Sequence, residues 1–176
     1  MNIQSTPVDD LLEQLKAPFP KESHKARKLP GGSYYIYVPW DCYVDRLNQL
    51  LGLNWSISYS DPIVVGDYLS VRAQLTIASE VGITIRDGLG TTRTFPELND
   101  EGKEKIIGDP PNNATREALR DACHQFGMGR YLDNQAEVCN LLQVKDPQTL
   151  YVQTSRPKKP GEISREQWQA KKAANQ

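Results

Sequence analysis

The chain has 176 residues, 38% of them hydrophobic, with 21 Lys and Arg against 22 Asp and Glu and a formal net charge of -1. That length fits one domain with polar extensions, and the apolar content is sufficient for a globular core. The balanced charge excludes a uniformly basic nucleic-acid binder, although an average hides local clusters of one sign.

The N-terminal region predicts a short amphipathic helix and then a basic segment. Thr6 is a suitable cap, Pro7 suits the first helical turn, and apolar residues recur behind them at helical spacing until prolines end the pattern. Residues 16–28 carry five basic residues against one acid, a local excess of +4. Such a cluster is typical either of a solvated surface or of a site for a polyanion.

A glycine-rich turn at residues 30–32 precedes a tyrosine-rich run, residues 34–38, that predicts a β-strand. From Trp40 to Leu51 the apolar residues recur at helical spacing, and Gly52 stands where a C-terminal cap is expected. Aromatic side chains in such elements are typical of a core or a subunit interface, and we rank base stacking below that interpretation.

The middle of the chain changes to the period of two that is typical of strands. Residues 55–59 and 68–77 alternate apolar and polar side chains, and residues 81–86 repeat the pattern. We expect three or four strands in one curved antiparallel sheet. Its exposed face should carry Arg72 and Arg86, either lining a groove or simply solvated.

Residues 91–111 predict a long loop. A helix capped by Asn112 or Asn113 should then run to about Phe126, and a weaker helical stretch should cover residues 136–142. The whole pattern predicts an α+β fold in which a curved antiparallel sheet packs on helices.

The helix that ends near Phe126 carries a basic row beside its apolar stripe. Arg116, Arg120 and His124 recur at every fourth residue, so each step advances about 6 Å along the axis. That distance is comparable with the separation of phosphates on an extended strand, and the arginine fork suits phosphate oxygens. The alternative interpretation pairs the two arginines with surface acids, namely Glu117, Asp121 or Glu137.

The chain holds an ordered set of motifs, which are Arg46-Leu47-Asn48, Gly52, Trp55, Leu119-Arg120 and Phe126-Gly127. In this order the set resembles the N-terminal domain of the Rad fifty-two (Rad52) family of recombination mediators and its phage and bacterial DdrA-type relatives. The resemblance covers roughly residues 31–132. It implies ATP-independent annealing of complementary single-stranded DNA, in recombination and double-strand break repair, by a βββα core that assembles into a homo-oligomeric ring.

The resemblance also implies a basic groove that holds the DNA backbone and leaves the bases free to pair. Family groove positions fall on Arg120, Asp121, His124 and Cys42, and of these only Arg120 keeps a full positive charge. His124 is protonated only to a minor extent at neutral pH unless a phosphate raises its pKa, so its contribution to DNA binding should grow in mild acid. No catalytic residue, metal or cofactor is expected. The candidate DNA-binding residues are Arg116, Arg120, His124, Arg130, Arg72 and Arg86.

Two other functions stay open. A metal-dependent nuclease could use aspartates, although the chain lacks a phosphate loop, a zinc-protease motif and a serine elbow. The departures at Cys42 and Asp121 would suit a ring-forming structural or adaptor protein without DNA annealing. The aspartates considered for a nuclease are Asp87, Asp100, Asp109 and Asp121.

Cys42, Cys123 and Cys139 are widely spaced and form no C-x-x-C pair, so we expect reduced core thiols and neither a disulfide framework nor a zinc site. No run approaches the roughly eighteen apolar residues of a membrane span, and the N-terminus lacks signal-peptide features. We expect a cytoplasmic protein of bacterial or phage origin, associated with the nucleoid when bound to DNA, and no membrane partner.

We expect three regions along the chain. Residues 1–30 form an N-terminal helix and basic linker, residues 31–145 an annealing core, and residues 146–176 a polar, basic, flexible tail. The tail is a candidate contact for a second DNA strand, or for a recombination or single-strand-binding partner protein.

Overall fold

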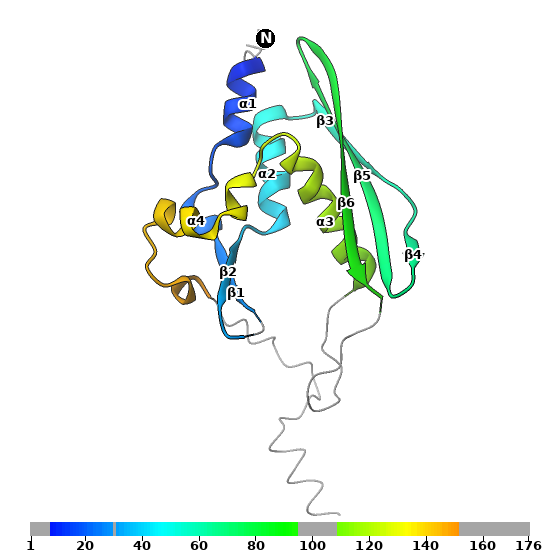
Figure 1. Cartoon of the computed structure of the whole chain (residues 1–176). Coiled ribbons are helices and arrows are strands. Elements are labelled where there is room, and N and C mark those ends of the chain that lie inside the picture. The colour runs from blue at the N-terminus through cyan, green and yellow to red at the C-terminus, as the bar shows by residue number, and fades with distance from the viewer. Residues whose placement is uncertain (1–7, 30, 95–108, 152–176) are drawn as a thin grey trace, which may run out of the picture.

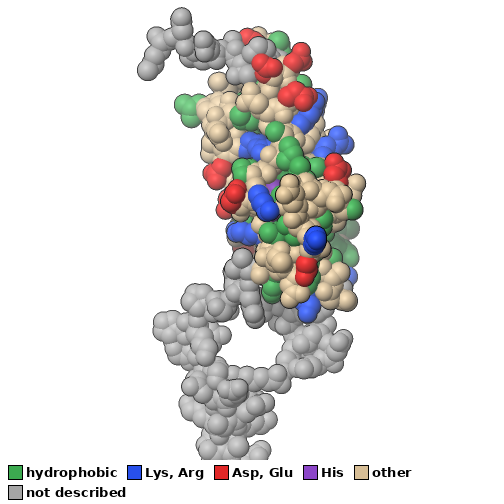
Figure 2. Space-filling view, turned by 90° about the vertical axis from the view of Figure 1, so that its left-hand side faces the viewer, with side chains coloured by type: hydrophobic (Ala, Val, Ile, Leu, Met, Phe, Trp, Pro, Cys, Tyr) green, Lys and Arg blue, Asp and Glu red, His purple; other side chains and the backbone are tan. Residues whose placement is uncertain are grey.

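The computed structural model describes residues 8–29, 31–94 and 109–151. Within these ranges the chain has an α+β fold with four α-helices and two separate antiparallel sheets (Figure 1). None of these helices is long and apolar enough to cross a membrane. Figure 2 shows that basic and acidic side chains are interspersed on the side of α1 and α4, in keeping with the near-zero net charge.

The larger sheet is built on a long hairpin of β5 (Tyr68–Ser79) and β6 (Gly82–Arg93). β3 (Trp55–Tyr59) and β4 (Ile63–Val65) both pair antiparallel with the other edge of β5, so the sheet is open. The buried face of β5 confirms the predicted alternation, and it comprises Leu69, Val71, Ala73, Leu75 and Ile77.

The register of the hairpin corrects the predicted orientation of β6. Arg86 stands opposite the buried Leu75, whereas Arg72 belongs to the outer set, so the two arginines lie on opposite faces of the sheet. Ile83 and Ile85 are on the outer face, with 71% and 47% of their surface exposed. Alternation shows which residues share a face, but it does not show which face is buried. The prediction placed the apolar set of β6 on the buried face, as is usual, and it failed because that set is exposed here.

α3 (Pro110–His124) lies along the inner face of this sheet, over β5 and β6 (Figure 1). The approach is very close, because a Cβ on Gly88 would stand 2.2 Å from the backbone nitrogen of Ala122. A Cβ on Gly90 would stand 1.8 Å from the carbonyl oxygen of Ala114. Two strand glycines thus let the helix backbone rest directly on the strand.

The smaller sheet pairs β1 (Lys25–Lys28) with β2 (Tyr34–Tyr37), and α2 (Trp40–Leu51) follows with the predicted bounds. Gly52 then takes a positive φ of 57°. α1 (Val8–Lys16) and the segment that follows it also contribute to the core, and a 3-10 turn η1 (Lys21–Ser23) without buried residues then leads to β1. The core includes Leu15, Phe19, Ile36, Tyr43, Leu47, Leu119 and Val138.

Arg46, a member of the motif set, fixes the end of α1 to α2. Its guanidinium donates one hydrogen bond to the carbonyl oxygen of Ala17 and another, of 3.0 Å, to the carbonyl oxygen of Pro18. It also lies 3.8 Å from the centre of the Phe19 ring. These contacts satisfy carbonyl groups that the end of a helix leaves without partners, so Arg46 has a structural role here.

Several boundaries differ from the sequence prediction. α3 begins at Pro110 and not after Asn112 or Asn113, because proline is tolerated in the first helical turn. β6 continues to Arg93, past the expected start of the loop, and β1 and β4 were not predicted as strands. Residues 95–108 and the tail from residue 152 lie outside the described residues.

The C-terminal part of the described chain confirms the weaker helix. A glycine turn leads into the 3-10 helix η2 (Arg130–Asp133), and α4 (Gln135–Leu142) follows, with Val138 and Leu142 buried. A last 3-10 turn, η3 (Pro147–Leu150), precedes the end of the described residues.

Candidate nucleic-acid interface

A cleft of about 540 Å³ opens between the β1–β2 hairpin and the first turns of α3. The start of α2 and the end of β6 complete its walls. Four basic side chains and one carboxylate line it, which gives a formal charge of +3 in a chain whose net charge is -1. Such a concentration attracts anions. The charged lining residues are Lys25, Arg27, Arg116, Arg120 and Glu117.

β1 presents its basic side chains by simple alternation. Ala26 is buried at 5% exposure, so Lys25 and Arg27 on either side of it point the other way and are exposed. Arg27 stands opposite Tyr35 in the register, and its guanidinium lies 5.2 Å from the centre of that ring. The sequence prediction counted these charges but placed them in a linker. A small apolar residue between two basic ones was the available signal for a strand.

α3 places Arg116 and Arg120 one turn apart on the same wall of the cleft. The guanidinium of Arg116 lies 5.3 Å from the centre of the Trp40 ring, at the first residue of α2. Trp40 is 41% exposed, so it lines the cleft and is not a core residue. The aromatic face stabilises the cation beside it and holds it at the cleft.

Arg120 forms an ion pair with Glu117, one of the acids considered as alternative partners. Its Nη2 lies 2.6 Å from Oε1 and 2.5 Å from Oε2 of that carboxylate. The arginine and glutamate side chains are 36% and 42% exposed. The pair is therefore a feature of the cleft wall that solvent reaches.

His124, the third member of the predicted row, lies deeper than the two arginines. It borders a pocket of about 40 Å³ beside Arg120, and its buried Nε2 has no hydrogen-bond partner among the described residues. Burial lowers the pKa of His124; Asp133 and Asp121 oppose this shift, while Arg120 and Arg130 add to it. In the DNA-free protein His124 is therefore neutral at neutral pH.

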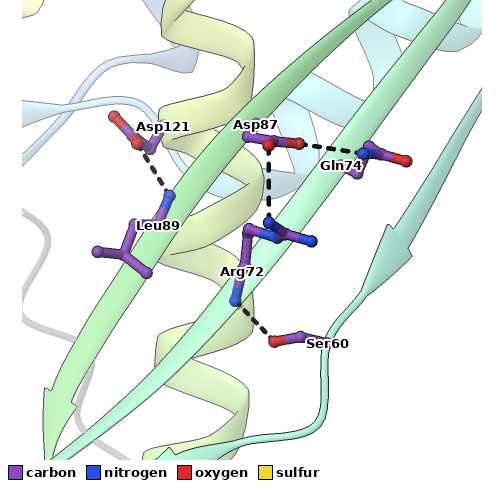
Figure 3. A network of polar contacts seen from close by, with 6 residues as sticks. All are labelled: Ser60, Arg72, Gln74, Asp87, Leu89 and Asp121. Atoms are coloured by element: carbon purple, nitrogen blue, oxygen red, sulfur yellow. Dashed lines mark hydrogen bonds and ion pairs between the residues drawn. The ribbon is translucent and has the colours of Figure 1, made fainter.

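The structure does not bring the other three predicted residues to the cleft. Arg72 lies on the outer face of the sheet, 4.0 Å from the carboxylate of Asp87 (Figure 3). Arg86 projects from the opposite face and donates a hydrogen bond to the carbonyl oxygen of Ile85 at 3.0 Å. Arg130 is exposed on η2 and is not among the lining residues.

Asp121, at a position where the resemblance implies a basic groove residue, has a structural contact. Its Oδ2 accepts a hydrogen bond of 2.9 Å from the backbone N–H of Leu89 (Figure 3). Leu89 lies between the two close-packed glycines on β6, which is an edge strand of the sheet. The carboxylate thus joins α3 to the strand beneath it and covers one amide of the open edge.

Within the described ranges, no group of three or more His, Cys, Asp or Glu side chains is placed to hold a metal ion. Of the aspartates considered for a nuclease, Asp100 lies outside those ranges. The three cysteines are free thiols, and Cys123 alone among them is fully buried. Burial raises the pKa of Cys123 to about 12, so it remains a protonated core residue. Cys42 and Cys139 are half-buried, so the expectation of core thiols holds fully for one of the three.

The sequence of this chain is similar to known proteins over most of the described residues. The sequence model of a family described as Rad52/22 family double-strand break repair protein matches residues 8–151. The protein named DNA repair RAD52-like protein 1, mitochondrial, from Arabidopsis thaliana is 28% identical over 133 residues, which cover 73% of this chain and 68% of that protein. The resemblance seen in the motifs is confirmed. The chain belongs to the Rad52/22 family of double-strand break repair proteins.

Proposed function

We propose that this protein binds single-stranded DNA in the cleft and anneals complementary strands without a nucleotide cofactor, in recombination and double-strand break repair. One observation carries the proposal: β1 and α3, far apart in sequence, bring four cations to one cleft of a chain that has no net positive charge. Membership of a double-strand break repair family supports the same function.

Arg116 and Arg120 give the cleft a spacing suited to a DNA backbone. One turn of helix separates them by about 6 Å along the axis, so they can contact successive phosphates of an extended strand. Annealing brings two polyanions together, and cations that neutralise phosphates reduce their repulsion. When the backbone is the part that is held, the pairing edges of the bases stay free. Nothing in this mechanism requires nucleotide hydrolysis.

We also propose that protomers assemble into a ring that joins their clefts. The outer face of the larger sheet carries exposed apolar side chains, which is typical of a protein contact surface. A single cleft covers only a few nucleotides, whereas repeated clefts multiply weak contacts along a strand. The exposed side chains are Ile63, Val65, Ile83, Ile85 and Leu89, each between 47% and 71% exposed.

Annealing of two labelled complementary oligonucleotides, without a nucleoside triphosphate, tests function and assembly when light scattering is run on the same sample. We expect annealing faster than the protein-free reaction, unchanged on addition of ATP, and a particle mass several times the 19.8 kDa of one chain. Annealing at the protein-free rate would exclude the annealing function, and a mass of one chain would exclude the ring. Shortening of the oligonucleotides during this assay would indicate nuclease activity.

A further inference from the structure

Glu117 stands out in the cleft because it is the one acid among the described residues that line it. It lies on α3 between Arg116 and Arg120 in sequence, and both of its carboxylate oxygens contact Nη2 of Arg120. An acid in this position weakens the attraction of the cleft for any polyanion. Its presence therefore calls for a reason connected with the cleft.

A carboxylate and a phosphate offer the same feature to a guanidinium, namely two anionic oxygens that accept hydrogen bonds. Glu117 uses only Nη2, and both side chains of the pair are more than a third exposed. An exposed pair at i and i+3 contributes little free energy, so a phosphate can replace the carboxylate without unfolding the helix.

We propose that Glu117 is a built-in competitor of DNA: it occupies Arg120 in the free protein and gives the arginine up when a DNA phosphate enters the cleft. This inference rests on the proposed function. Arg120 then has an anionic partner with and without DNA, so binding gains only the difference between the two contacts. The displaced carboxylate also stays near the strand and repels it.

Competition of this kind suits an annealing protein, because the product duplex has to leave the surface on which it formed. A cation left without a partner would oppose release of the strand. Glu117 supplies that partner from the neighbouring turn of the same helix. Glu117 is thus a determinant of affinity and of release, and not a phosphate contact itself.

The test is fluorescence anisotropy of a labelled oligo-dT strand with Glu117→Gln, which keeps the size of the side chain and removes its charge. We expect binding about fivefold tighter than wild type at low salt, the scale of an exposed ion pair. Glu13→Gln is the matched control, because Glu13 forms an equivalent i, i+3 pair of 3.0 Å with Lys16 on α1, outside the cleft. We expect that control to bind as wild type does.

A double-mutant cycle with Arg120→Ala separates exchange from simple repulsion. If the carboxylate competes for Arg120, the gain from Glu117→Gln falls below about twofold once the arginine is removed. A full gain in the Arg120→Ala background would overturn the exchange, as would Glu117→Gln binding no tighter than wild type. Those outcomes leave the proposed function standing. If wild type itself fails to bind at low salt, the proposed function falls and this inference falls with it.

Discussion

A buried histidine, His24, ties the N-terminal segment to the rest of the fold. His24 is 4% exposed, with Nε2 2.8 Å from the hydroxyl of Tyr131 and Nδ1 3.0 Å from the carbonyl oxygen of Pro20. The same hydroxyl accepts a hydrogen bond of 3.0 Å from the backbone N–H of Phe19. The network assigns the proton to Nδ1, which donates to Pro20 while Tyr131 donates to Nε2, so the neutral imidazole satisfies every group.

Protonation of the imidazoles of His24 and His124 should destabilise the protein in mild acid. Burial lowers the pKa of His24 and of His124 below the ordinary 6.5, so the unfolded chain takes up protons first. Stability is therefore complete above about pH 6.5 and is lost as the pH falls from there towards the folded pKa values. We expect a flat urea midpoint from pH 7 to 8 and a lower one at pH 5.5. The double variant His24→Gln, His124→Gln should lose less between pH 6.5 and 5.5, and an equal loss would contradict the account.

The lowered pKa of His124 also bears on DNA binding. Because the pKa of His124 in the DNA-free protein is lower than 6.5, the midpoint of its protonation lies below pH 6.5. Among the three residues of the predicted row, Arg116 and Arg120 thus carry the charge of the cleft at neutral pH.

At the scale of elements, helix positions could be predicted from the sequence, whereas strand orientation could not. The bounds of α2 follow from apolar spacing and Gly52, which are local signals. Which face of β6 is buried depends on Gly88 and Gly90, because these glycines admit α3 to that side and leave Ile83 outside. The alternation of apolar and polar residues within β6 carries no information about a helix that follows about twenty residues later in the chain.

The contact between α3 and β6 should be intolerant of a single methyl group. Gly90→Ala forces a Cβ into the backbone of α3, so we expect a loss of about 3 kcal/mol in the free energy of unfolding. Thr91→Ala, on the outer face of the same strand, is the control and should cost under about 1 kcal/mol. Urea denaturation of both variants measures the difference. Equal stabilities would show that the helix does not sit on the strand as described.

At the scale of the whole molecule, the cleft itself was not predictable from the sequence. Arg116 and Arg120 were found from their helical spacing, but Lys25 and Arg27 reach the same cleft only through pairing of β1 with β2 and the packing of the core. Arg72, Arg86 and Arg130 looked equivalent to them in sequence and lie elsewhere. Long-range packing, and not residue type, decides which basic residues share a surface.

The measurement that tests the account most directly is the salt dependence of binding to single-stranded oligo-dT, compared between basic residues inside and outside the cleft. We expect Arg27→Ala and Arg120→Ala each to weaken binding and to reduce the slope of log affinity against log salt by roughly 0.7, as for one lost phosphate contact. Arg130→Ala removes the same charge from an exposed position outside the cleft and should keep the wild-type affinity and slope. Loss of affinity in Arg130→Ala, with the two cleft variants unchanged, would contradict the cleft as the DNA site.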